Sequence, residues 1–70
     1  MPLEYIEIKN TNDELLMNEV VLTLQELITL PWRKEKDGTI LVAYPMFYCM
    51  EKFRRFLEVL EKCDWKMRVE

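Results

Sequence analysis

The sequence predicts an α+β domain in which two amphipathic helices cover one face of a small four-stranded sheet. Two segments repeat apolar residues with helical spacing, and four shorter segments have the composition or the alternation of β-strands. A chain of 70 residues is long enough for one domain, so residues 1–70 are expected to form a single unit. The predicted order is strand, helix, strand, strand, helix, strand.

The first part of the chain predicts a strand followed by a helix. In residues 3–9, Ile6 and Ile8 lie on one side of an extended chain. From Glu14 to Leu30 the apolar residues form one stripe on a helical wheel, and Pro31 should end this helix. The candidates for capping its first turn are Thr11, in a capping box with Glu14, and alternatively Asn12 or Asp13.

A β-hairpin is predicted in the middle of the chain. Asp37 and Gly38 suit a two-residue loop between strands at residues 32–36 and 39–44. The first of these strands carries charges, as expected at a sheet edge, and the second is apolar on both sides, as expected at a sheet centre. Residues 65–70 alternate apolar and polar side chains, which predicts a last strand with one polar face.

A second helix is predicted after Pro45, because proline is tolerated in the first helical turn. The order of elements and the charges on the second and fourth strands match the ferredoxin-like split βαβ arrangement, in which strands one and three are central. The alternative is a β-hairpin and helix unit that is completed by dimerisation. The core stripe predicted for the second helix consists of Met46, Cys49, Met50, Phe53, Phe56, Leu57 and Leu60.

The composition argues against an enzyme. The chain contains no histidine, which removes the most frequent general base and metal ligand. Its single glycine is used in the hairpin, so no phosphate-binding loop is expected. Cys49 and Cys63 are too few ligands for a structural zinc site and are expected to be buried or interfacial free thiols. We therefore expect no catalytic, cofactor-binding or metal-binding residues and no small-molecule ligand.

The most apolar stretch, residues 40–50, contains no charged residue. It is shorter than the roughly 20 residues that span a bilayer, and it divides into a central strand and the start of a helix. The N-terminal residues lack the basic and apolar regions of a secretory signal. We expect a cytoplasmic protein without membrane contact.

Apolar residues make up 50% of the chain, more than a core of this size readily encloses. Part of the apolar surface is therefore expected to contact another chain. On the second helix, an apolar shoulder beside the core stripe predicts self-association into a homodimer. This predicted shoulder consists of Tyr48, Phe56, Val59 and Cys63.

The first helix is expected to present an acidic surface, because no basic residue occurs from Asn10 to Trp32. Two leucines lie among its acidic residues, and the combination suits a basic partner protein. These features favour a small non-enzymatic interaction or regulatory protein. The residues predicted to contact the partner are Glu14, Leu15, Glu19, Leu22 and Glu26.

Nucleic-acid binding is the alternative function. Basic residues beside aromatic ones can hold phosphates and stack nucleobases. The net charge of −3 opposes phosphate binding, so nucleic acid is the weaker of the two hypotheses. The candidate residues for this function are Trp32, Arg33, Lys34 and Arg55.

Overall fold

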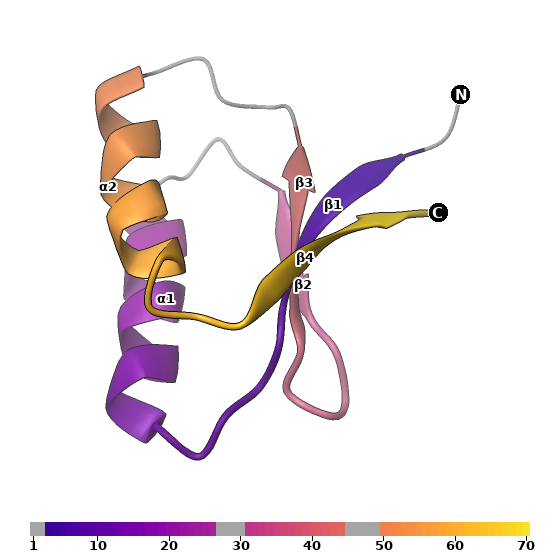
Figure 1. Cartoon of the computed structure of the whole chain (residues 1–70), viewed down its shortest axis with the longest axis horizontal. Helices are drawn as coiled ribbons and strands as arrows, with labels where there is room; N and C mark the ends of the chain where they lie inside the picture. The colour runs from indigo at the N-terminus through magenta and orange to yellow at the C-terminus, as the bar shows by residue number, and fades with distance from the viewer. Residues whose placement is uncertain (1–2, 27–30, 45–49) are drawn as a thin grey trace.

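Six elements follow one another in the order that the sequence predicts (Figure 1). The computed structural model describes residues 3–26, 31–44 and 50–70 of the chain. The predicted small α+β class is confirmed, whereas the expected last turn of the first helix and the junction at Pro45 lie outside the described residues. The elements are β1 (Glu4–Ile8), α1 (Glu14–Glu26), β2 (Trp32–Lys34), β3 (Ile40–Tyr44), α2 (Met50–Leu60) and β4 (Trp65–Val69).

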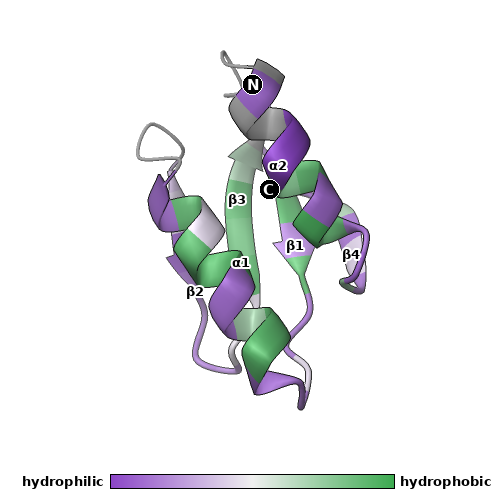
Figure 2. Cartoon of the chain, turned by 90° about the vertical axis from the view of Figure 1, so that its left-hand side faces the viewer, coloured by the Kyte–Doolittle hydropathy of each residue, from purple (hydrophilic) through white to green (hydrophobic). Residues whose placement is uncertain are grey.

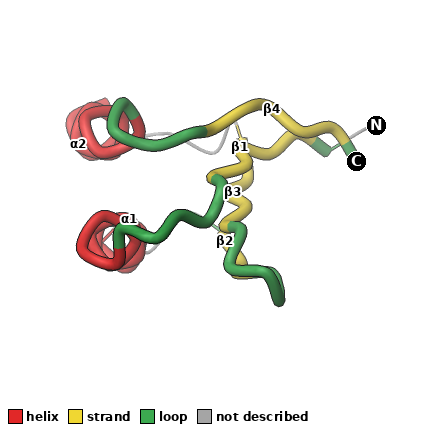
Figure 3. The backbone as a smooth tube through the Cα atoms, turned by 60° about the horizontal axis from the view of Figure 1, so that its bottom comes forward, coloured by secondary structure: helices red, strands yellow, loops and turns green. Residues whose placement is uncertain are grey.

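The four strands form one sheet in the order β2-β3-β1-β4, and each neighbouring pair is antiparallel. The strands β1 and β3 are central, and the charged strands β2 and β4 form the edges. Both helices lie on the same face of the sheet, and no described helix covers the other face, which we call the open face (Figure 3). Side chains that pair across strands share a face, so Ile6 lies beside Val42 and Met67 on the helix side.

The hydrophobic core lies between the sheet and the two helices. Figure 2 shows hydrophobic residues along β3, hydrophobic and hydrophilic residues alternating along β1, and helices that carry both kinds of residue. Burying these side chains supplies most of the free energy that opposes chain entropy in a domain this small. The buried core cluster consists of Ile6, Ile8, Met17, Val20, Leu24, Ile40, Val42, Phe56, Val59 and Leu60.

Leu41 is buried on the open face instead. Its side chain is 0% exposed but is not part of the core cluster, because alternate residues of β3 point away from the helices. Its cross-strand neighbours are Glu7 and Arg33. We infer that the apolar stems of charged side chains on this face cover Leu41.

The β2–β3 hairpin has a three-residue loop and not the predicted two-residue loop. The Glu35 N–H donates to the Thr39 carbonyl at 2.7 Å, which closes a loop of residues 36–38. Gly38 has a φ of 91°, and its N–H donates to the Glu35 carbonyl at 3.0 Å. A turn followed by a left-handed residue produces this loop length, and Gly38 occupies that last position.

Asp13 caps the first turn of α1. Its Oδ1 accepts the Leu16 N–H at 3.0 Å, and the Thr11 hydroxyl oxygen accepts the Asp13 N–H at 3.2 Å. Among the candidates that the sequence offers, Asp13 is therefore the capping residue, and Thr11 orders the turn before it.

The buried face of α2 is rotated relative to the predicted core stripe. Phe56 and Leu60 are buried as predicted, but Leu57 is 39% exposed and Val59 is 5% exposed. The helical wheel does not show that the Val59 side of α2 also faces α1. Among the other predicted stripe residues, Met46 and Cys49 lie outside the described residues, as do the side chains of Met50 and Phe53.

Candidate functional site

A groove runs along the outer surface of the molecule between α1 and α2. Both helices contribute side chains to it, because they pack side by side on the same face of the sheet (Figure 3). We call it the helix-pair groove. It is lined by Leu15, Asn18, Glu19, Leu22, Thr23 and Glu26 of α1 and by Arg55, Glu58, Val59 and Lys62 of α2 and the turn after it.

Leu15 and Leu22 are large apolar residues of the helix-pair groove that are unusually exposed to solvent. Their side chains are 84% and 60% exposed. They are seven residues apart, so they lie two helical turns apart on almost the same line of α1. This line is on the side of α1 opposite the buried Met17 and Val20, so both leucines point to solvent.

Two ion pairs join α1 to α2 across this groove. Arg55 Nη1 lies 3.0 Å from Glu26 Oε2, and Lys62 Nζ lies 3.4 Å from Glu19 Oε1. All four side chains are roughly half exposed, so each pair contributes about 0–1 kcal/mol to stability. Because both pairs are weak, Glu19 and Glu26 can exchange their intrachain basic partners for other basic groups.

Four of the five residues predicted to contact a partner come together in the helix-pair groove, namely Leu15, Glu19, Leu22 and Glu26. Glu14 does not line it. Glu14 precedes Glu19 by five residues, which places it about 140° away around the helix. Glu14 instead lies in the first turn of α1, where its negative charge interacts favourably with the helix dipole.

The predicted apolar shoulder of α2 is mostly buried. Phe56 and Val59 are 0% and 5% exposed and belong to the core, and Val59 also lines the helix-pair groove, so little of either side chain is exposed. Cys63 is partly buried against the core, and its thiol donates to the Val59 carbonyl at 3.4 Å. Burial and the nearby Glu19 carboxylate raise the pKa of the Cys63 thiol. Tyr48 lies outside the described residues.

The candidate nucleic-acid residues do not form one surface. Trp32 packs against the core from the helix side of β2, and Lys34 pairs with Ile40 on that same side. Arg33 lies on the open face, and Arg55 lies on α2 beside Glu26. Both arginines already contact carboxylates, so they are less available to bind phosphate.

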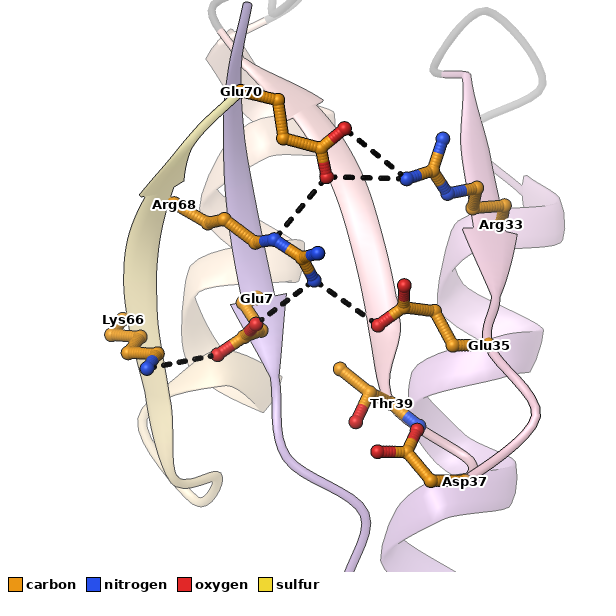
Figure 4. A network of polar contacts seen from close by, with 8 residues as sticks. All are labelled: Glu7, Arg33, Glu35, Asp37, Thr39, Lys66, Arg68 and Glu70. Atoms are coloured by element: carbon orange, nitrogen blue, oxygen red, sulfur yellow. Dashed lines mark hydrogen bonds and ion pairs between the residues drawn. The ribbon is translucent and has the colours of Figure 1, made fainter.

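Sequence reasoning missed a charged network on the open face (Figure 4). Arg68 of β4 contacts Glu7 of β1 at 3.1 Å, Glu35 at 3.1 Å and Glu70 at 3.2 Å. A hydrogen bond to Glu35 and the charges of these carboxylates raise the pKa of Arg68. Strand alternation alone places Glu7 and Arg68 on the polar side, but only the strand order shows that they meet.

The network also includes two further bases of this face. Lys66 lies 3.4 Å from Glu7, and Arg33 lies 3.2 Å from Glu70 and 5.5 Å from the centre of the Tyr5 ring. Three acidic and three basic side chains therefore neutralise one another across the sheet. A face with balanced charges and an aromatic ring already covered by arginine is poorly suited to single-stranded nucleic acid.

The fold and the helix-pair groove together define a small α+β protein with a surface of apolar and charged side chains on paired helices. No protein-family model matches the chain, and no curated protein is significantly similar to it in sequence. Among the described residues, no helix has the length and apolar content needed to cross a membrane. The same residues contain no group of three or more potential metal ligands in suitable positions.

Proposed function

We propose that this protein is a small non-enzymatic interaction protein that binds a partner in the helix-pair groove. The exposure of Leu15 and Leu22 carries this proposal, since two aligned leucines at 84% and 60% exposure cost solvation free energy unless a partner covers them. Lone exposed leucines are common on protein surfaces, but two aligned leucines in a groove between helices suit an incoming helix.

The charges of the groove define the chemistry of this partner. Glu19, Glu26 and Glu58 line it, and they outnumber the basic residues Arg55 and Lys62. A basic amphipathic helix fits, because its apolar face would cover the leucines while its lysines or arginines replace the weak intrachain pairs. The two leucines are separated by about 10.5 Å along α1, which matches two turns of such a helix.

We also propose that the domain has the ferredoxin-like split βαβ arrangement. The central position of β1 and β3, the antiparallel pairing of every neighbour, and both helices on one face support this assignment. In this arrangement each β-α-β crossover is right-handed. An experimental structure with either crossover left-handed would contradict it.

The function is tested by comparing what the wild type and the double variant Leu15→Ser/Leu22→Ser retain from native lysate. We expect a basic partner to bind the wild type and to be lost from the variant. Leu3→Ser is the matched control, because Leu3 is 61% exposed and lies outside the groove. Equal recovery of the same proteins by all three chains would contradict the proposal.

The nucleic-acid alternative is tested separately by titrating labelled single-stranded RNA and duplex DNA at two salt concentrations. The groove proposal predicts no binding at low salt. Binding that weakens steeply with salt and is lost in Arg33→Glu or Arg55→Glu would favour the alternative instead.

A further inference from the structure

We propose that the free edge of β4 pairs with the same edge of a second copy of this chain. The two antiparallel β4 strands would then join two four-stranded sheets into one. This surface is separate from the helix-pair groove, and it differs from the α2 shoulder that the sequence suggested. Three observations support the proposal: the direction of the backbone groups, an exposed apolar strip and the order of charges along β4.

The backbone of β4 has one unpaired side within the described part of the chain. Leu3 and Glu70 exchange two hydrogen bonds at 2.9 and 2.8 Å, and the Lys9 N–H donates to the Asp64 carbonyl at 2.9 Å. The even-numbered residues of β4 therefore point their backbone groups towards β1. The N–H and C=O groups of Trp65, Met67 and Val69 point outwards, where no described strand lies.

An apolar strip accompanies this unpaired edge. Trp65, Met67 and Val69 are 43%, 44% and 62% exposed, and they share the helix side of the sheet. Leu57 of α2 is 39% exposed, and it lies about 200° around the helix from Arg55, which faces α1. Leu57 is therefore on the side of α2 turned away from α1. An edge with unpaired amides and an apolar strip favours strand addition.

The charges on β4 select a second copy in a particular register. When Arg68 faces its counterpart, Lys66 of each copy lies opposite Glu70 of the other, which gives two complementary pairs. When Met67 faces its counterpart, Lys66 lies opposite Arg68 and Asp64 lies opposite Glu70, so every charged pair is repulsive. Of these two registers the one centred on Arg68 is therefore favoured, and its central arginines remain neutralised by Glu7 and the other carboxylates of the network.

The opposite edge of the sheet is less suited to pairing. β2 has three residues, follows Pro31 and carries Arg33 and Lys34. Short and charged edges with a neighbouring proline resist strand addition. β4 has five residues, three of which are exposed and apolar.

Charge exchange tests both the dimer and its register. Lys66→Glu alone and Glu70→Lys alone place like charges opposite each other, so each should dimerise at least about tenfold more weakly than the wild type. An equimolar mixture restores both complementary pairs and should form a heterodimer. Sedimentation equilibrium of the two variants and their mixture measures this directly. Each substitution has the same effect on its own chain whether the variant is alone or in the mixture. Stronger association in the mixture therefore reports the contacts between the two chains.

The proposal is overturned if the wild type stays monomeric at about millimolar concentration or if the mixture associates no better than its components. It is also overturned if Lys66→Glu dimerises more tightly than the wild type, since the register centred on Met67 predicts that result. Leu22→Ser should leave the dissociation constant unchanged, because Leu22 belongs to the helix-pair groove. The proposed dimer and the proposed partner site can therefore be rejected independently of each other.

Amide hydrogen exchange locates the contact. The amides of Met67 and Val69 should become protected as the protein concentration rises, because they point away from β1 in the single chain. The Arg68 amide faces β1 and should be protected at every concentration. Dimerisation without added protection at Met67 and Val69 would exclude the β4 edge as the interface.

Discussion

Gly38 occupies a position in the β2–β3 loop that disfavours any side chain. Its φ is 91°, and a Cβ at this position would lie 2.4 Å from Asn10 Nδ2 and 2.6 Å from Asn10 Cγ. We expect Gly38→Ala to lower the free energy of unfolding by about 1–3 kcal/mol. Urea denaturation measures the change. In the background of Asn10→Ala, the same substitution should cost less, because the two closest contacts are removed and only the backbone strain and the 3.0 Å approach to the Cβ of residue 10 remain.

Asp37 stabilises the same loop through its carboxylate. Hydrogen bonds from Thr39, whose N–H donates to Asp37 Oδ1 at 2.9 Å, lower the pKa of Asp37. The unfolded chain therefore binds a proton more readily than the folded one. This contribution to stability is present above the ordinary aspartate pKa of about 3.9 and is lost as the pH falls through the folded value.

Asp37→Asn should remove this pH-dependent part of the stability. We expect the wild type to exceed the variant in free energy of unfolding at neutral pH, with the difference disappearing in acid. Urea titrations from neutral pH down to about pH 2 measure it. A difference between the two proteins that is constant over this range would show that the carboxylate does not stabilise the loop.

The N-terminus of α1 depends on one capping side chain. Asp13 accepts the Leu16 N–H, which otherwise has no partner within the helix. Asp13→Ala should lower the free energy of unfolding by about 0.5–2 kcal/mol. Asn12→Ala is the matched control, since Asn12 is the exposed neighbour and does not cap the helix. Equal losses in both variants would contradict this assignment.

The elements themselves were predictable because their signals are local. Helical spacing, the Asp37-Gly38 loop and the alternation of residues 65–70 each lie within a few neighbouring residues. The loop length was not predictable, because both loop types accept glycine at Gly38 and only the cross-strand hydrogen bonds distinguish them. The rotation of α2 was also missed, since a helical wheel does not show which second element the helix contacts.

The candidate site depends on contacts between distant parts of the chain. The sequence predicted the exposed Leu15 and Leu22, because both lie outside the apolar stripe of α1. It did not place Arg55 and Lys62 across from the acidic residues of that helix, since no local pattern sets the distance between α1 and α2. The network around Arg68 was missed for the same reason.

Arg68 links both edge strands to the centre of the sheet. Arg68→Met retains a long apolar side chain but leaves Glu7 and Glu35 without their shared guanidinium. We expect a lower free energy of unfolding at neutral pH and low salt. The deficit should shrink in about 1 M salt, where the Debye length is about 3 Å and carboxylate repulsion is screened. Lys62→Met, which breaks one exposed pair, should change stability much less.

Substitution of Phe56 tests whether folding of the chain depends on the core described above or on association through α2. A domain of this length is stable by roughly 4–10 kcal/mol in total. Phe56 is 0% exposed in the core, so Phe56→Ala should cost about 3–5 kcal/mol and leave the chain partly unfolded at 25 °C. Circular dichroism and urea titration at low micromolar concentration measure this, with Leu22→Ala as the exposed control.

The outcome separates two explanations for the high apolar content of the chain. If Phe56 contacted a second chain, its loss would weaken association and leave the dilute monomer folded. Its position against Ile6, Ile8 and Leu24 in one cluster means that the dilute monomer itself should lose structure. Among the described residues, the apolar surface available to other chains is then limited to exposed side chains such as Leu15 and Val69, whose truncation should leave the monomer folded.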